Sequence, residues 1–152
     1  MVLSEARLVE KLSKRKFTCK RCSRCCRIDP GMVMLTAEDA DNAASLLGIP
    51  RDVFVEKYCR EIYKDSNTYV GLKEKQNYDC IFWEKEGCSI YKARPLQCRT
   101  FPFWPYLVEE DAQWIIEKNR CPGLDSAVDS LSLSDKLAFY RQEKCAKYLE
   151  WK

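Results

Sequence analysis

Apolar residues recur at helical spacing early in the chain. In residues 3–16, Leu8 and Leu12 fall on one face and charged residues surround them, which predicts an amphipathic helix. Further along, Thr36 precedes the stretch AEDADNAASLL, which has acidic residues in its first turn, and Gly48 follows it. Because threonine caps helix N-termini and glycine commonly ends helices, this pattern predicts a second helix.

Two more helices are predicted later in the chain. Pro50 suits the first turn of a helix through residues 51–63. Ser134 is a suitable N-cap for a final helix over residues 135–149. Apolar side chains at a spacing of four predict the buried stripe of the first of these helices, and they are Phe54, Tyr58 and Ile62.

The middle of the chain has shorter, strand-like patterns. Residues 68–73 form one candidate strand. A glycine-containing loop between residues 81–83 and residues 89–91 predicts a β-hairpin, and a second hairpin is predicted from residues 106–108 and 113–117. Mixed with the helices, these short elements predict an α+β fold.

Length and composition fit one domain. The chain has 152 residues, of which 46% are hydrophobic, so it can bury a core of its own. We therefore expect a small, irregular single domain over residues 1–152, organised around cysteine metal sites, with terminal helices and short hairpins. Its metal-binding core is expected to span about residues 17–123, with the C-terminal helix outside it.

Ten cysteines are far more than a chain of this length usually carries. Such enrichment indicates either a secreted disulfide framework or metal binding in a reducing compartment. A secretory signal peptide has an unbroken apolar run of about 7–15 residues, whereas charges are spread throughout residues 1–17. No apolar stretch approaches the roughly 20 residues of a membrane span. We therefore expect a cytoplasmic protein, away from membranes, whose thiols are reduced.

Charge and the absence of histidine narrow the chemistry. The formal net charge is +3 with neutral thiols, and the sequence contains no histidine. A Ser-His-Asp arrangement and mixed Cys/His metal sites are therefore excluded. Basic residues outnumber acidic ones in residues 1–30, which fits a nucleic-acid-binding stripe. The same cations can neutralise thiolates, and no known nucleic-acid fold signature is present, so nucleic acid is the less favoured partner.

The densest cysteine motif is Cys19-x-x-Cys22-x-x-Cys25-Cys26. Three cysteines with two residues between neighbours are typical of loops that hold a [4Fe–4S] cluster, the fourth thiolate coming from elsewhere. Zinc sites more often use separated cysteine pairs. Adjacent residues point their side chains in different directions, so Cys26 is an awkward co-ligand of Cys25 and suits a second centre.

Four more cysteines stand beside turns or at the edges of predicted elements: Cys80, Cys88, Cys98 and Cys121. With the first four they are enough for two four-cysteine sites, although the spacing does not decide how they divide. Cys59 and Cys145 fall inside predicted helices without a neighbouring cysteine. We expect these two to be small buried hydrophobes.

Arg94 and Arg99 flank Cys98 in a stretch stiffened by Pro95 and Pro102. One role for the two guanidiniums is to bind an anionic group of a cofactor or substrate. Another is to offset thiolate charge or to bond carbonyls that the prolines leave free. The second role is favoured because a thiolate-rich site needs positive charge nearby in any case.

Several of these motifs together resemble the YkgJ-type cysteine-cluster family, described as a zinc- or iron-chelating CxxCxxCC domain. The resemblance covers roughly residues 17–123, and its motifs are FTCKRCSRCC, CIFW, CSIYKARPLQCRTFPF and CPG. It implies a metal-binding set of Cys19, Cys22, Cys25, Cys26, Cys80, Cys88, Cys98 and Cys121. A larger relative, flagellin lysine N-methylase, carries a similar cluster and transfers methyl groups to protein lysines, which is an analogy only.

These observations lead to one main functional hypothesis and an alternative. The first is a protein with one or two iron–sulfur clusters, most simply [4Fe–4S], in a redox or enzymatic role that includes a methyl-transfer-related one. The alternative is a structural zinc module that mediates protein or nucleic-acid interactions. Labile metal storage is disfavoured because the cysteines sit in a core-forming chain. We expect a monomer with an unspecified protein or small-molecule partner.

Overall fold

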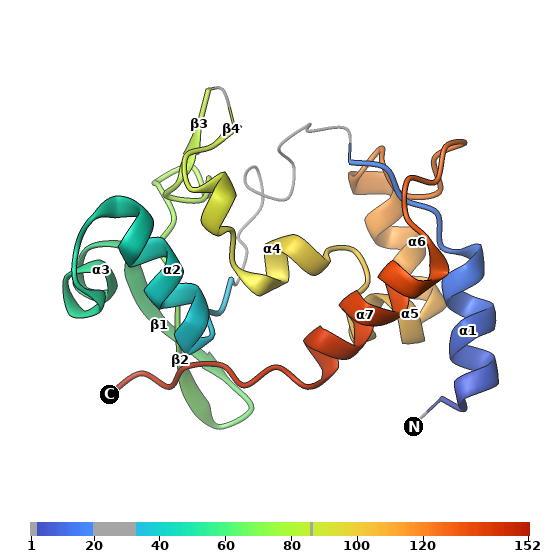
Figure 1. Ribbon diagram of the computed structural model, residues 1–152, viewed down its shortest axis with the longest axis horizontal. Helices are drawn as coiled ribbons and strands as arrows, with labels where there is room; N and C mark the ends of the chain where they lie inside the picture. The colour runs from blue at the N-terminus through green and yellow to red at the C-terminus, as the bar shows by residue number, and fades with distance from the viewer. Residues whose placement is uncertain (1–2, 20–32, 86) are drawn as a thin grey trace. The chain divides into compact units, whose positions relative to one another are not determined.

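The computed structural model describes residues 3–19, 33–85 and 87–152. The chain divides into two compact units. Their described parts are residues 3–19 and 100–145 in the first unit, and residues 33–85, 87–99 and 146–152 in the second. The predicted α+β class is confirmed, because helices are accompanied by short antiparallel strands (Figure 1). The single-domain organisation stays a prediction.

The first unit is helical. Its elements are α1 (Glu5–Lys14), α5 (Pro105–Glu109), α6 (Asp111–Arg120) and α7 (Leu133–Lys144). The first and last predicted helices are confirmed. The cap of α7 lies at Ser132 instead of Ser134, because the Ser132 hydroxyl accepts the Asp135 N–H in a capping box. The last helix therefore begins and ends earlier than predicted.

The hairpin predicted from residues 106–108 and 113–117 is wrong, because α5 and α6 occupy this stretch. Pro105 stands in the first turn of α5, where its missing N–H costs nothing. Leu107, Val108 and Trp114 are buried in the core of the first unit. Burial of these side chains at helical spacing overrides the strand preference of valine, tyrosine and tryptophan.

Helices of the second unit surround a small sheet. They are α2 (Ala37–Leu47), α3 (Arg51–Tyr58), the 3₁₀ turn η2 (Tyr91–Ala93) and α4 (Leu96–Thr100), the last residue of which belongs to the first unit. The second predicted helix is confirmed in detail. Thr36 and Asp39 form a capping box at its start, and Gly48 ends it with a φ of 70°.

The helix predicted over residues 51–63 is correct only in its first half. It ends at Tyr58, and β1 (Cys59–Lys64) begins at the next residue. β1 pairs antiparallel with β2 (Asn67–Leu72), which confirms the strand predicted over residues 68–73. The turn between them has φ values of 50° and 66° at Asp65 and Ser66, as two-residue hairpin turns require.

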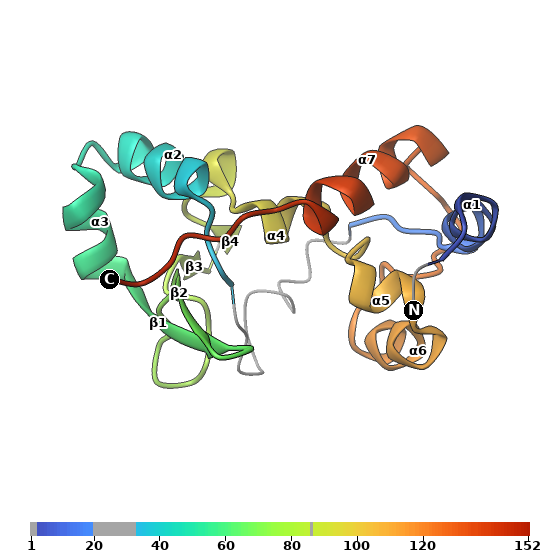
Figure 2. The same ribbon diagram turned by 90° about the horizontal axis from the view of Figure 1, so that it is seen from below.

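Two further segments run beside β2. The Leu72 N–H donates to the Val33 carbonyl at 2.9 Å, and the Val70 N–H donates to the Leu149 carbonyl at 2.8 Å. Both views show the C-terminal segment passing along the sheet (Figures 1 and 2). A Cβ at Gly71 would lie 1.9 Å from the end of the Ile62 side chain and 3.0 Å from the Val33 carbonyl oxygen, so a larger residue here would displace the buried Ile62 side chain.

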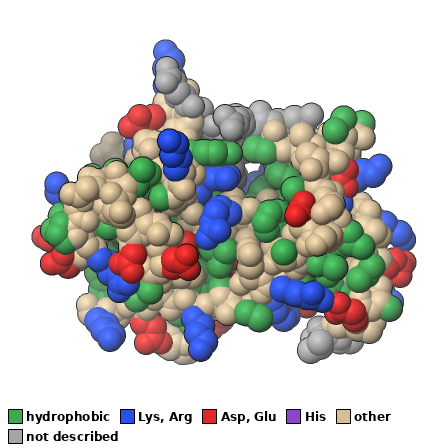
Figure 3. Space-filling model, in the orientation of Figure 1, with side chains coloured by type: hydrophobic (Ala, Val, Ile, Leu, Met, Phe, Trp, Pro, Cys, Tyr) green, Lys and Arg blue, Asp and Glu red, His purple; other side chains and the backbone are tan. Residues whose placement is uncertain are grey.

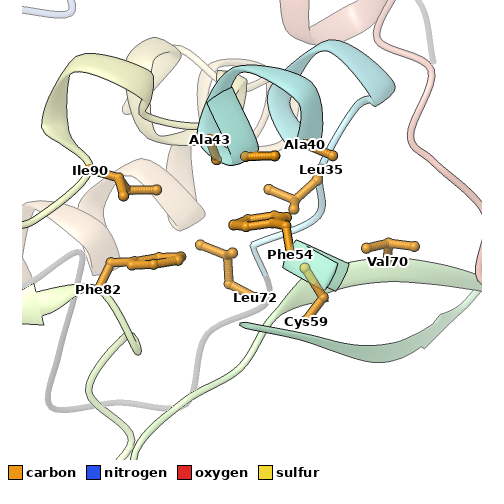
Figure 4. Close-up of a cluster of buried hydrophobic side chains, with 10 residues drawn as sticks. Leu35, Ala40, Ala43, Phe54, Cys59, Val70, Leu72, Phe82 and Ile90 are labelled. Carbon is orange, nitrogen blue, oxygen red and sulfur yellow. The ribbon is translucent and has the colours of Figure 1, made fainter. Parts of the chain in front are cut away.

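The core of the second unit lies between α2, α3 and the sheet (Figure 4). Phe54 is fully buried at its centre and stacks on Phe82, with ring centroids 6.1 Å apart. Leu72 and Ile90 approach the same rings in the close-up. β3 (Trp83–Glu84) and β4 (Gly87–Cys88) follow Phe82 along the chain. No helix within the described residues is long and apolar enough to cross a membrane.

Candidate metal centre

Five of the eight predicted ligands belong to the described residues, whereas Cys22, Cys25 and Cys26 lie outside them. The first unit contains Cys19 and Cys121, and the second contains Cys80, Cys88 and Cys98. Cys19 is exposed and the other four are partly buried. Partial burial keeps a sulfur accessible to a metal while shielding it from bulk water.

A short hairpin brings Cys80 and Cys88 together in the second unit. β3 pairs antiparallel with β4, and Trp83 is the register partner of Cys88. The Trp83 N–H donates to the Cys80 carbonyl at 2.9 Å, and the Ser89 N–H donates to the Phe82 carbonyl at 2.8 Å. A hairpin is present here as predicted, but its two-residue strands lie nearer the turn than expected: Glu84 and Gly87 were predicted as loop, and residues 89–91 are not strand.

The surroundings of Cys80 suit a metal-bound sulfur. Burial raises the pKa of the Cys80 thiol above its usual 9.0. Hydrogen bonds from the backbone N–H groups of Phe82 and Trp83 act to lower this pKa, and the nearby Cys88 thiol acts to raise it. Two thiolates side by side repel each other, so a bound cation is the natural way to ionise both.

Cys98 lies on α4, and hydrogen bonds fix the start of that helix. The Leu96 N–H donates to Asp39 Oδ1 at 3.1 Å. The Met34 N–H donates to Gln97 Oε1 at 2.8 Å. Both residues that precede Cys98 are therefore tied to the segment that follows the CxxCxxCC run in the sequence.

The carboxylate of Asp39 connects the start of α2 to the start of α4, and we call this set of contacts the Asp39 frame. The Asp39 side chain is 2% exposed, and Oδ2 accepts the Thr36 N–H at 3.0 Å. The Arg99 guanidinium lies 3.6 Å from Oδ1. One buried carboxylate thus caps α2 and holds the N-terminal end of α4 in place.

Arg94 and Arg99 bond nearby carbonyls. The Arg99 Nε donates to the Arg94 carbonyl at 3.1 Å, which is the carbonyl that precedes Pro95. The Arg94 Nε donates to the Tyr91 carbonyl at 3.1 Å, and its guanidinium lies 3.9 Å from the centre of the Tyr91 ring. These contacts match the carbonyl-bonding role expected from the sequence. Binding of an anionic group stays a prediction.

In the first unit, a single antiparallel bridge with two flanking hydrogen bonds, called the ladder below, joins segments that are distant in sequence. Phe17 and Leu124 form an antiparallel bridge, and the Thr18 N–H donates to the Gly123 carbonyl at 3.1 Å. A Cβ at Gly123 would lie 2.3 Å from the Thr18 carbonyl oxygen. The close approach of the two backbones therefore explains the glycine.

Cys19 and Cys121 lie at the same end of this ladder. Cys19 follows Thr18 directly, and Cys121 stands two residues before Gly123. Because the two segments run antiparallel, the chain leaves the ladder at Cys19 where the other segment enters it from Cys121. Cys121 also packs against the core of the first unit.

A partly buried ion pair supports the ladder. Lys136 on α7 is 2% exposed, and its Nζ lies 2.5 Å from Asp129 Oδ2. Asp129 Oδ1 accepts the Phe17 N–H at 3.3 Å. Burial acts to raise the pKa of Asp129, but the hydrogen bonds from Lys136 and from the Phe17 N–H outweigh it and lower that pKa.

The two remaining cysteines differ from each other. Cys59 is 2% exposed in the core of the second unit, which confirms its predicted burial, although it begins β1 and is not inside a helix. Burial raises the pKa of its thiol to about 12, so it stays protonated and inert. The predicted burial of Cys145 is wrong, because this residue lies exposed at the C-terminal end of α7.

Sequence patterns missed the residues that hold these cysteines in place. They are Asp39, Gly123, Asp129 and Lys136. Asp39 gave one usable signal, since it stands at the third position after the helix-capping Thr36. Gly123 and Asp129 gave no local signal because they contact Thr18 and Phe17, which are distant in sequence, and Lys136 acts through Asp129.

Within the described ranges, no group of three or more Cys, Asp or Glu residues is close enough to hold one metal ion. Among the described predicted ligands, Cys80 and Cys88 share a hairpin, Cys19 and Cys121 adjoin the two segments of the ladder, and Cys98 lies on α4. Partly buried sulfurs, with N–H donors to one of them, are the donors that zinc and iron–sulfur centres use. The residues present therefore fit a thiolate-bound metal.

This donor set is typical of metal-binding proteins. Over residues 18–127 the chain matches the CxxCxxCC family, described as a "Putative zinc- or iron-chelating domain". The chain belongs to this family, which confirms the resemblance seen in its motifs.

An uncharacterized protein of Methanocaldococcus jannaschii is 34% identical over 89 residues, which cover 57% of this chain and 44% of that protein. The chain therefore matches less than half the length of this relative. No solved structure matches the chain.

Proposed function

We propose that the eight family cysteines hold one or two iron–sulfur clusters, most simply of the [4Fe–4S] type. The observation that carries the proposal is the CxxCxxC spacing of Cys19, Cys22 and Cys25, which is typical of loops around a four-iron cluster. The hydrogen-bonded sulfur of Cys80 adds support, because N–H donors to sulfur stabilise reduced clusters and tune their potential.

The role that we propose is redox or enzymatic, in a cytoplasmic monomer. When bound, an iron–sulfur cluster supplies one-electron chemistry. This chain supplies thiolate ligands, N–H donors and apolar shielding, the last from Phe82, which is 4% exposed beside the hairpin. We also propose that Arg94 and Arg99 hold an anionic group of a small-molecule partner, because their guanidiniums lie on either side of Cys98 in sequence.

A structural zinc module is the second candidate, and a different observation favours it. Cys80 and Cys88 form a cysteine pair on a hairpin, separate from the CxxCxxCC run, and zinc sites more often combine cysteine pairs from separate segments. In this role the metal stabilises the fold and a partner protein binds the surface. Figure 3 shows basic and acidic side chains interspersed over the visible face, which does not favour nucleic acid.

Absorption spectra separate the two candidates. The protein is purified under anaerobic conditions, and its spectrum is recorded before and after reduction with dithionite. An iron–sulfur protein is brown, with broad absorption near about 400 nm that bleaches on reduction. A colourless protein whose metal can be replaced by Co²⁺, with the visible bands of tetrahedral thiolate coordination, would favour the zinc module and overturn the iron–sulfur proposal.

A further inference from the structure

The hairpin that carries Cys80 and Cys88 is anchored at both ends in the core of the second unit. Phe82 is 4% exposed and stacks on Phe54, while Ile90 on the other side of β4 is fully buried. The Ile81 N–H donates to the Lys73 carbonyl at 3.1 Å. The hairpin is therefore fixed by packing as well as by its own hydrogen bonds.

The pairing of β3 with β4 also fixes the spacing of Cys80 and Cys88. Trp83 pairs with Cys88 in the register of β3 and β4, and its N–H closes the turn that begins at the Cys80 carbonyl, at 2.9 Å. Cys80 therefore stands one hydrogen-bonded turn before the strand residue that faces Cys88. Separating the two cysteines requires the hairpin to open, which would break contacts of Phe82 with the core.

We infer that Cys80 and Cys88 bind the same metal centre, as a two-thiolate half-site that the hairpin forms before the metal arrives. This inference rests on the proposed function and assigns a pairing that the spacing of the cysteines left open. A shared cation removes the repulsion between two neighbouring thiolates.

Metal stoichiometry tests the pairing directly. Cys80→Ser, Cys88→Ser and the double variant are purified under anaerobic conditions, and metal per chain is counted by native mass spectrometry. We expect each single variant to lose the same metal centre and the double variant to lose no more than either single variant. Cys59→Ala is the matched control, because Cys59 lies in the same unit and is buried away from water; it keeps the full metal content.

A second measurement uses the unmodified chain and does not depend on how the variants fold. Metal is withdrawn stepwise with EDTA while exposed thiols are labelled with iodoacetamide. Lys85 lies between the two cysteines, so trypsin places them on separate peptides whose labelling is followed by mass spectrometry. We expect Cys80 and Cys88 to become reactive with one rate constant, and Cys59 to stay unlabelled.

The outcomes distinguish the inference from the function on which it rests. A double variant that loses as much metal as the two single variants combined, or two different labelling rates, would overturn the shared centre alone. Unmodified protein that carries no metal would overturn the proposed function and the inference with it.

Discussion

Asp39 offers the sharpest test of the frame that positions Cys98. Replacement by alanine leaves the Leu96 N–H and the Thr36 N–H without their acceptor, at contacts of 3.1 Å and 3.0 Å. A partly buried donor that loses its partner costs about 1–3 kcal/mol. Arg99 is half-exposed and 3.6 Å away, so its loss adds little. We expect Asp39→Ala to lower the free energy of unfolding by about 2–4 kcal/mol, after water satisfies part of the loss.

The assay is urea unfolding of the purified protein, followed by circular dichroism. Asp39→Asn keeps one acceptor oxygen and is expected to fall between the wild type and the alanine variant. Asp41→Ala is the matched control on the same helix, because this exposed carboxylate pairs with Arg51 at the surface and its loss should change stability little. If Asp39→Ala and Asp41→Ala unfold at the same urea concentration, the reasoning about the frame is refuted.

Three other predictions follow from the structure. Gly123→Ala forces a Cβ against the Thr18 carbonyl and should lower stability by about 1–3 kcal/mol in thermal unfolding; unchanged melting would contradict the ladder. Cys59→Ala should keep its full metal content and lose about 1 kcal/mol of stability; loss of metal in elemental analysis would make Cys59 a ligand. The pKa of Asp129 in the folded protein lies below its usual 3.8. Its ion pair with Lys136 therefore stabilises the fold fully above pH 3.8, and this stabilisation is lost as the pH falls through the pKa of the folded state. Urea midpoints from about pH 5 to about pH 2 should show this loss and Lys136→Met should lack it; an equal slope in both would refute the ion pair.

Local sequence signals correctly predicted elements whose ends are marked by a capping residue and a terminating glycine. The helix after Thr36 was predicted because a capping residue precedes it and Gly48 ends it in the left-handed conformation. The stretch from residue 59 to residue 63 was predicted as helix from the spacing of Phe54, Tyr58 and Ile62. Ile62 is buried, but it is buried from a strand that pairs with β2. Pairing with β2, the next segment of the chain, overrides the local helical period.

The cysteine ligands were recognisable from spacing and turns, whereas the contacts that hold them were not. Asp39 and Leu96 are 57 positions apart, and their hydrogen bond exists only once α2 and α4 have packed. The close approach of Gly123 to Thr18 likewise depends on two segments that are distant in sequence. Cys145 was predicted to be buried from its residue type alone, and nothing in the sequence indicated that it is exposed.

The content of iron, zinc and acid-labile sulfide in anaerobically purified protein tests the central claim most directly. The claim predicts roughly 4–8 iron atoms per chain with a matching amount of sulfide. Stoichiometric zinc without sulfide would contradict the iron–sulfur assignment and leave the zinc module. Protein that folds and contains neither metal would contradict the metal-binding function itself.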